Sequence, residues 1–246
     1  VRSKEQAIEL LNQYVADKPS LDIHTNRAEI KKVPRVAFVF GGQGSIYAGM
    51  SKELYRQQPS FAKALDECCQ ILDGILDTSL LQLMHSEDEE ASRLLNAKAQ
   101  YAQAALFSIQ YALSQMWAAL GLKPCAVIGH SLGEYAAACL AGVLSLKDAL
   151  HIVAERGRLT DTLETNGSML VVFSTLEKIS PLVQTHAAHV SVAVINSENS
   201  IVLSGDKTAL QAINAQCQAL KIDTHPLAVT HAFHSPLMDP ILAELE

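Results

Sequence analysis

The sequence predicts an α/β fold in which a short parallel sheet carries a serine at a sharp strand-to-helix turn. Two apolar runs each end in glycine-containing turns, and a later stretch has the strand and helix order βαββαβ. The apolar runs are typical of parallel strands. The βαββαβ order is typical of a ferredoxin-like lobe. We therefore expect a large α/β core with a small ferredoxin-like subdomain inserted in it.

Composition places the chain among globular proteins. Apolar residues make up 49% of its 246 residues and the net charge is −7, so there is no basic footprint for nucleic acid. No apolar run reaches membrane-spanning length, and the start lacks a signal segment. The five cysteines show neither a C-x-x-C pair nor metal spacing, which favours a reducing, cytoplasmic setting. We expect neither nucleic acid nor a membrane as a partner.

The first 34 residues are predicted to form a linker. Ser3 to Tyr14 can form a short amphipathic helix, which Lys18-Pro19-Ser20 then breaks. We expect this linker to pack on a neighbouring domain or against the core surface. Because the sequence opens with Val1 and ends within a predicted helix at Glu246, we expect it to be a piece of something longer.

The core is predicted to begin with a strand from Arg35 to Phe40, whose continuous apolar character is typical of burial on both faces. A glycine-rich loop, Gly41 to Ser45, follows it directly. This loop has neither the Walker spacing nor the G-x-G-x-x-G pattern of phosphate cradles. The loop is equally consistent with a plain tight turn and with a backbone that approaches a ligand closely.

Helices are expected next. Pro59 to Leu76 reads as one helix, and Ala97 to Leu120 as a longer one with apolar residues at three-and-four spacing. Gln103 is a polar residue amid alanines in the longer helix. Its side chain either lies on a surface turn of the helix or is a buried amide that points toward a site.

Ser131 stands between Gly129 and Gly133, directly after the apolar run that ends at Ile128. This G-x-S-x-G pattern between a strand and an alanine-rich helix predicts a nucleophile elbow of the hydrolase-like α/β core, which exposes the serine hydroxyl. The helix start adds free N–H groups and a positive dipole end, which suit a developing oxyanion. The alternative is a serine N-cap between two turn glycines.

Arg156 lies in the next predicted helix, Ser145 to about Leu163. An arginine there is usually solvated or ion-paired, here with Glu155 or Asp161. The alternative is a guanidinium fork for a substrate carboxylate.

The βαββαβ order occupies residues 168–229, which we predict to be the small subdomain; residues 35–167 and 230–246 would form the large one. After it come His231 and His234. Either histidine is a candidate for the base that a serine nucleophile needs. A metal site is disfavoured because no third ligand has matching spacing.

Three motifs, taken in order, resemble one family. Gly42-Gln43-Gly44-Ser45, Gly129-His130-Ser131-Leu132-Gly133-Glu134 and Ala232-Phe233-His234-Ser235 are similar to segments of the acyltransferase domain of polyketide synthases. That family is related to the malonyl-CoA:acyl-carrier-protein transacylases of fatty-acid synthesis. The resemblance covers residues 34 to 246, and the leading segment resembles the linker between a ketosynthase and an acyltransferase.

The resemblance implies roles for eight residues. Ser131 would carry the acyl group as an ester and His234 would act as base; the backbone N–H groups of Gln43 and Leu132 would form the oxyanion hole. The substrate-binding positions would be Arg156, paired with the malonyl carboxylate, and three pocket residues: Gln103, His130 and Phe233. The implied substrate is malonyl-CoA, and the domain would bind no cofactor or metal. Its implied partners are an acyl carrier protein bearing phosphopantetheine, the flanking ketosynthase and other synthase domains.

Phe233 bears on substrate choice. An Ala-Phe-His-Ser segment resembles malonyl-selecting domains, because the ring would crowd the α-methyl group of methylmalonyl. The sequence also departs from the family pattern. Gly41-Gly42 replaces a more usual proline or threonine, which would loosen the oxyanion loop, and Ala104 stands where proline is usual. The chain stops before the family's final segment, which supplies the backbone carbonyl that orients the histidine.

Two other functions stay open at this point. A serine hydrolase or thioesterase of α/β type needs an acid after Ser131 and a His-Gly-Gly-Gly-like loop, and the sequence offers no such loop and no acid at an obvious strand end. An inactive scaffolding fragment of a synthase would form no covalent adduct.

Overall fold

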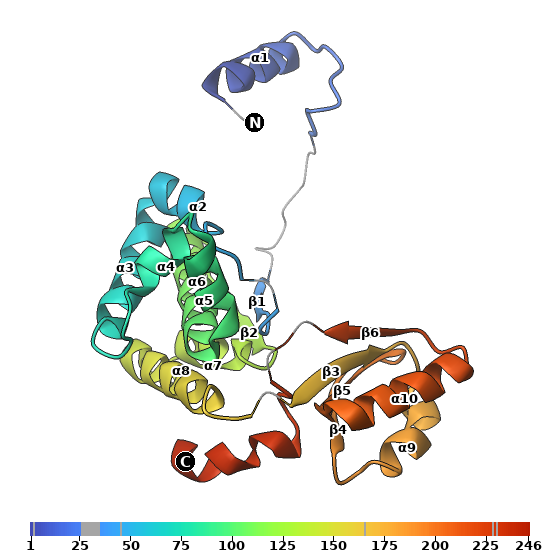
Figure 1. Ribbon diagram of the computed structural model, residues 1–246. Coiled ribbons are helices and arrows are strands. Elements are labelled where there is room, and N and C mark those ends of the chain that lie inside the picture. Colours follow the sequence, from blue (N-terminus) through green and yellow to red (C-terminus); the bar gives the residue numbers. More distant parts are fainter. Residues whose placement is uncertain (2, 26–34, 45, 165, 228, 230) are drawn as a thin grey trace. The chain divides into compact units, whose positions relative to one another are not determined.

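The computed structural model describes residues 1, 3–25, 35–44, 46–164, 166–227, 229 and 231–246. The chain divides into two units, Val1–Arg35 and Val36–Glu246 (Figure 1). Residues 26–34 of the predicted linker, Ser45 of the glycine-rich loop and Thr230 lie outside the described residues. None of the helices in the described ranges is long and apolar enough to cross a membrane.

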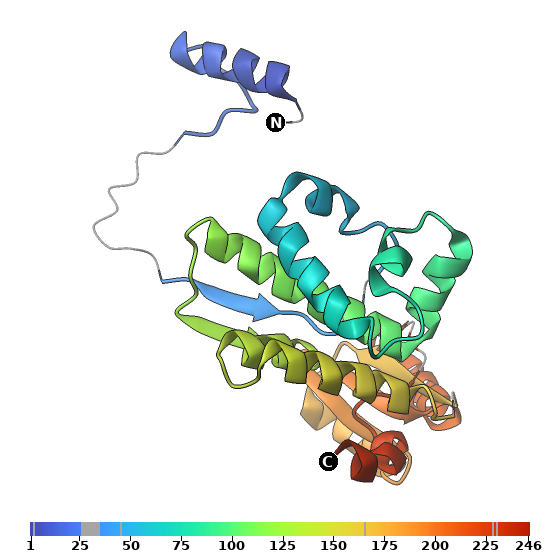
Figure 2. The same cartoon turned by 90° about the vertical axis from the view of Figure 1, so that its left-hand side faces the viewer.

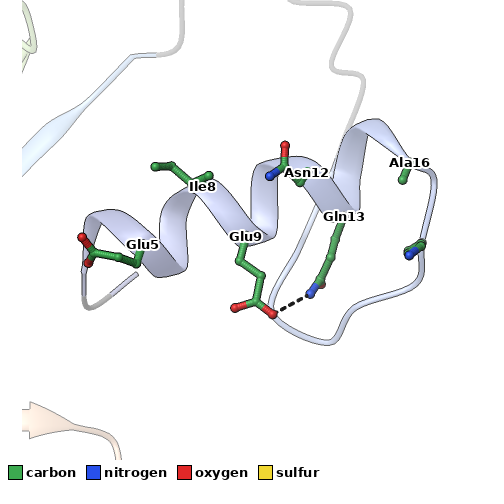
Figure 3. A pocket seen from close by; sticks show the side chains of 7 residues that line it. Glu5, Ile8, Glu9, Asn12, Gln13 and Ala16 are labelled. Carbon is green, nitrogen blue, oxygen red and sulfur yellow. Dashed lines mark hydrogen bonds between the residues drawn. The ribbon is translucent and has the colours of Figure 1, made fainter.

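The first unit contains helix α1 (Lys4–Val15), which confirms the helix predicted there. The Ser3 side chain caps its start by accepting a hydrogen bond from the Gln6 backbone N–H. Along the helix, Gln13 Nε2 donates to Glu9 Oε1 at 3.3 Å (Figure 3). None of its residues is buried, and Leu11 is 61% exposed. Packing of this helix on a neighbouring domain stays a prediction.

The large subdomain of the second unit is built on a two-stranded parallel sheet. Strand β1 (Ala37–Phe40) pairs with β2 (Ala126–Gly129), with Phe40 opposite Gly129. In Figure 2 the blue strand β1 runs next to the green helix α6. The helices of this subdomain are α2 (Lys52–Gln57), α3 (Pro59–Leu72), α4 (Leu80–His85), α5 (Glu89–Ala97), α6 (Ala99–Ala119), α7 (Gly133–Leu140) and α8 (Leu146–Thr160).

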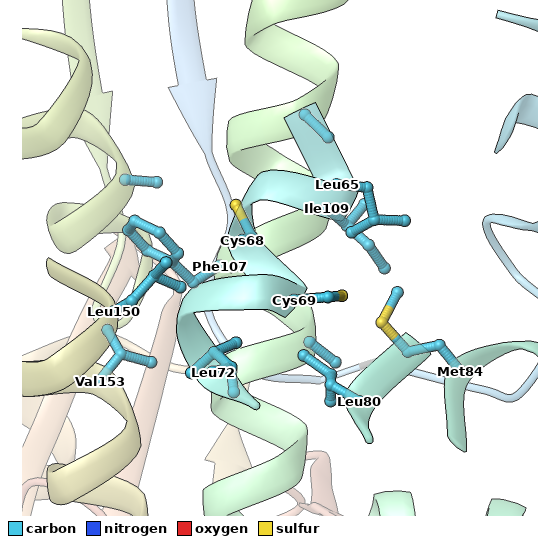
Figure 4. Packing of buried hydrophobic residues seen from close by; sticks show 14 of the residues in the cluster. Leu65, Cys68, Cys69, Leu72, Leu80, Met84, Phe107, Ile109, Leu150 and Val153 are labelled. Carbon is cyan, nitrogen blue, oxygen red and sulfur yellow. The ribbon is translucent and has the colours of Figure 1, made fainter. Parts of the chain in front are cut away.

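The main core lies where helices α3, α6 and α8 pack against one another. Cys68 and Leu72 of α3 are fully buried and belong to the same cluster as Phe107 of α6 and Val153 of α8 (Figure 4). Burial raises the pKa of the neighbouring Cys69 thiol to about 12. These cysteines therefore stay protonated at neutral pH and act as small apolar core residues.

The expectation that the first strand is buried on both faces is wrong within the described structure. Phe38 and Phe40 pack into the main core, but Val39 is 73% exposed and Ile128, opposite it in the register, is 58% exposed. Successive side chains of a strand point to opposite faces. One face of the two-stranded sheet is therefore packed on the core, and the other carries these exposed side chains.

The small subdomain confirms the predicted ferredoxin-like topology. Its sheet has the order β4-β5-β3-β6 with antiparallel pairing throughout, and α9 and α10 lie on one of its faces (Figure 1). Together with the parallel sheet, this confirms the predicted α/β fold class. The elements are β3 (Gly167–Val172), α9 (Leu176–Gln184), β4 (Val190–Ser197), β5 (Ser200–Asp206), α10 (Lys207–Ala219) and β6 (Thr224–Leu227).

The two faces of this sheet have different surroundings. Leu170 and Val172 of β3 pack in one cluster with residues of α9 and α10. Met169 and Val171, which alternate with them, belong to a second cluster that contains Phe233. The chain then returns to the large subdomain through the 3₁₀ helix η1 (Pro236–Ile241) and ends in α11 (Leu242–Leu245).

Candidate active site

Ser131 occupies the turn between β2 and α7, as the G-x-S-x-G pattern predicts. Its φ is 52°, a strained value for a residue other than glycine. The turn is so tight that a Cβ on Gly129 would lie 2.2 Å from the Glu134 backbone nitrogen, and one on Gly133 would lie 2.3 Å from the Phe40 carbonyl oxygen. Both glycines are therefore required by close backbone contact.

His234 is the histidine that meets this serine. Ser131 Oγ and His234 Nε2 lie 2.8 Å apart, within hydrogen-bonding distance. His231 is only 4% exposed and is hydrogen-bonded to the backbone at Leu163. The structure thus separates the two histidines that the sequence left as alternatives.

The segment around His234 is fixed on both sides. Phe233 is buried and packs on Met169 and Val202 of the small-subdomain sheet. On the other side, Ser235 Oγ donates to the Ala232 carbonyl at 2.7 Å and accepts from the Leu237 backbone N–H at 3.3 Å, which caps η1. His234 itself has a φ of 61°.

The pKa of His234 is lowered from its usual value near 6.5. Partial burial of the ring has the largest effect, followed by the positive charge of Arg156 and by His130. Each of these disfavours the imidazolium form. His234 is therefore neutral near pH 7 and able to accept a proton.

The predicted oxyanion-hole residues border the same cavity as Ser131. Gln43 and Leu132 both line it. Within the described ranges, neither backbone N–H donates a hydrogen bond to another protein group. His130 also lines the cavity, and its backbone N–H donates to the Phe40 carbonyl at 2.8 Å. This bond ties the elbow to the strand from which the glycine-rich loop emerges.

Arg156 lines the cavity from α8. Its Nη1 donates to Gln103 Oε1 at 2.6 Å, and its guanidinium carbon lies 5.8 Å from the centre of the Phe233 ring. Burial lowers the pKa of this guanidinium, but an arginine stays charged near neutral pH because its ordinary pKa lies far above that range.

The carboxylates near Arg156 in sequence are engaged elsewhere. Glu155 pairs with Arg158, and Asp161 accepts from the backbone N–H groups of Ala99 and Gln100. No ion pair of Arg156 with a carboxylate occurs in the described part of the chain. The charge faces the cavity without a counter-ion, in contrast to the ion-pair alternative.

Gln103 lies behind Arg156. It is fully buried and is absent from the residues that line the cavity. Close helix packing places it there, because a Cβ on Gly157 of α8 would lie 2.4 Å from the Gln100 Cα of α6. Gln103 therefore reaches the site through Arg156.

The cavity has a volume of about 200 Å³, and its wall on the small-subdomain side consists of residues that sequence reasoning missed. On β3 and β5 the missed side chains alternate with residues that pack in the cluster on the other face of the sheet. Period-two alternation in the sequence could have indicated the apolar ones, whereas no sequence signal marked Asn196. The missed residues are Met169, Val171, Val194, Asn196, Val202, Leu227 and Val229.

Comparisons with known proteins agree with this geometry. A family model described as "Acyl transferase domain" matches residues 37–246. The chain is 42% identical over 210 residues to the mycoketide-CoA synthase of Mycobacterium tuberculosis, and the match covers 85% of the chain and 5% of that protein. It is 42% identical over 212 residues to a phenolphthiocerol synthesis polyketide synthase of Mycobacterium marinum, covering 86% and 10%. The chain thus spans a small fraction of these relatives.

Solved structures give the same result. The acyltransferase domain from the second module of the salinomycin polyketide synthase has a TM-score of 0.88 and 36% identity, over 100% of this chain and 56% of that one. A malonyl-transacylase solved in complex with a type II polyketide synthase acyl-carrier protein has a TM-score of 0.76 and 32% identity, over 86% and 68%. The chain therefore belongs to the family of acyl transferase domains found in polyketide synthases.

Proposed function

We propose that this domain transfers a malonyl group from malonyl-CoA to the phosphopantetheine thiol of an acyl carrier protein. The observation that carries the proposal is the Ser131–His234 hydrogen bond beside an arginine that has no carboxylate partner in the described structure. A nucleophile, a base and a fixed positive charge in one cavity suit an acyl group that ends in a carboxylate.

In the first half-reaction Ser131 Oγ attacks the thioester carbonyl while His234 Nε2 takes the hydroxyl proton. The carbonyl oxygen becomes an oxyanion, for which the N–H groups of Gln43 and Leu132 are the proposed donors. The C–S bond then breaks, and the proton on His234 passes to the sulfur of the leaving CoA. The products are free CoA and a malonyl ester on Ser131.

The second half-reaction runs the same steps in reverse. The pantetheine thiol gives its proton to His234 and attacks the ester carbonyl, and Ser131 regains a proton as it leaves. The complex between a related malonyl-transacylase and an acyl-carrier protein supports a carrier protein as the acceptor. The multidomain synthases among the relatives support flanking synthase domains as further partners.

Arg156 is proposed to bind the free carboxylate of the malonyl group. Two N–H groups of a guanidinium match the two oxygens of a carboxylate. Gln103 accepts a hydrogen bond from one guanidinium nitrogen. Its amide is uncharged and therefore does not neutralise the charge of Arg156. The charge of Arg156 is thus kept for the substrate.

A hydrolase uses water instead of a thiol in the second step. The site offers an apolar small-subdomain wall beside Ser131 and, among the residues that line the cavity, no aspartate or glutamate to orient His234. These features favour a transferase over the Ser-His-acid arrangement of α/β hydrolases.

Intact-mass spectrometry after incubation with malonyl-CoA tests the proposal. We expect a malonyl adduct on the natural protein and none on Ser131→Ala. CoA release without an adduct would support a hydrolase, and the absence of both adduct and CoA release would support a scaffold. Either of the last two results would contradict the proposed transfer.

A further inference from the structure

We propose that Gln110 is a positioning residue that holds the oxyanion loop, residues 41–44, in place for acyl transfer. The proposal rests on the proposed function, because it concerns how the predicted N–H donor of Gln43 is positioned. Helix α6 would then position the oxyanion loop in addition to packing in the core.

The tie itself is one hydrogen bond between distant parts of the chain. Gln110 Nε2, on α6, donates to the Gly41 carbonyl oxygen at 2.7 Å. Gly41 is separated from Gln43 only by Gly42. A shift of the Gly41 carbonyl would therefore move the neighbouring peptide groups, including the N–H that is proposed to meet the oxyanion.

The loop needs such a tie because its own sequence restrains it little. A Cβ on Gly41 or Gly44 would meet no atom within 4 Å, and neither residue has a φ in the left-handed region. Close packing and backbone conformation therefore do not require glycine at these two positions. Their glycines leave the backbone with the largest conformational freedom of any residue.

The elbow side of the loop is already fixed. Phe40 accepts the hydrogen bond from the His130 N–H, and a Cβ on Gly42 would lie 2.9 Å from His130 Nδ1. Gln110 adds a restraint from α6, on the other side of the strand end. Gln103 lies two helical turns earlier on α6 and bonds Arg156. One helix thus ties both the substrate-binding arginine and the oxyanion loop.

Only a hydrogen-bond donor at position 110 can hold the Gly41 carbonyl in place. The Gly41 carbonyl can only accept, so the amide nitrogen must face it. In the described structure Gln110 Oε1 is buried with no hydrogen-bond partner, so the amide is held in place through the bond to Gly41. Gln110→Leu removes the donor at similar volume, and Gln110→Glu would set carboxylate oxygens against a carbonyl oxygen.

Single-turnover acylation measures the effect. We expect both variants to lower the rate constant of acyl-enzyme formation about tenfold, with malonyl-CoA and acetyl-CoA alike and with little change in KM. Losing an oxyanion donor outright costs about 10²- to 10³-fold, and a displaced donor costs less. Gln115→Leu is the matched control, because this half-buried glutamine of the same helix makes no side-chain hydrogen bond in the described ranges.

A second change tests the mechanism directly. A Cβ on Gly41 meets open space, so Gly41→Ala restrains the loop without a clash. In the Gln110→Leu background we expect Gly41→Ala to recover acylation several-fold. A purely structural role of Gln110 would lower the melting temperature and would show no such recovery.

Three results would overturn the proposal: unchanged acylation in both Gln110 variants, an equal loss in Gln115→Leu, or a loss with malonyl-CoA alone. The last would place Gln110 in carboxylate recognition. Failure of the natural protein to acquire any adduct would instead refute the proposed function, so the two failures are distinguishable.

Discussion

The large and small subdomains contribute different chemistry to the same cavity. The large subdomain supplies the hydroxyl of Ser131, the backbone N–H groups and the charge of Arg156, whereas the small-subdomain sheet supplies an apolar wall with Asn196 as its polar member. Under the proposed function, reactivity therefore depends on the large subdomain, and selection by shape depends on the sheet of the small one. Changes to Ser131 or His234 should then abolish chemistry. Changes to the sheet wall should alter selection by shape, and changes to Arg156 should alter selection by charge.

The segment of residues 231–235 joins the two subdomains. His234 bonds Ser131 of the large subdomain, and the preceding Phe233 packs on the sheet of the small one. Phe233 also lies over Arg156. A substitution in this segment can therefore affect chemistry or selectivity, depending on which of the two residues it changes.

The largest effect is expected from His234→Ala. Removing a positioned base costs about 10²- to 10⁴-fold in rate, and the loss should be equal for malonyl-CoA and acetyl-CoA because the base acts on the serine. Stopped-flow acylation measures it. His151→Ala is the control, since this exposed histidine of α8 bonds only the Lys147 carbonyl among the residues that the structure describes. A loss confined to malonyl-CoA would break the division between chemistry and selectivity.

A smaller effect is expected from Phe233→Ser, which enlarges the cavity beside the sheet. One methyl group in a pocket is worth about 1–3 kcal/mol, so the ratio of methylmalonyl to malonyl loading should rise about tenfold or more. Competition between the two CoA thioesters measures this ratio. Phe173→Ser is the matched control, because Phe173 is 53% exposed and does not line the cavity. An unchanged ratio would remove Phe233 from substrate selection.

The smallest effect concerns pH. His234 must be neutral to accept the serine proton, and its pKa is lowered from 6.5 by burial and by Arg156. Acylation should therefore rise with pH through an inflection below 6.5 and stay level near pH 7. In Arg156→Ala, with acetyl-CoA as substrate, the inflection should move upward. An inflection above 6.5 in the natural protein would contradict a neutral His234 in this environment.

Local sequence patterns were sufficient where a residue's role depends on its neighbours in the chain. The glycines around Ser131 predicted the elbow because their spacing reflects contacts within one turn. Strand and helix order predicted the ferredoxin-like lobe. The roles of the site residues were implied by family resemblance, and they stay proposals.

Contacts between distant segments could not be predicted in this way. Whether Gln103 is exposed or buried depends on how α6 and α8 pack together. Which of the two histidines reaches Ser131 depends on how the segment after the small subdomain packs. The exposed face of β1 was missed because an apolar run does not reveal how many layers cover it. The bond from Gln110 to Gly41 likewise joins residues far apart in sequence.

The most direct test of the central claim is competition between equimolar malonyl-CoA and acetyl-CoA for acylation of Ser131. Intact mass reports the ratio of the two adducts. We predict that Arg156→Ala reverses the preference from malonyl to acetyl while acetyl loading persists, and that Arg158→Ala, whose guanidinium pairs with Glu155 and Glu244, leaves the ratio unchanged. A malonyl preference that survives in Arg156→Ala would contradict the account.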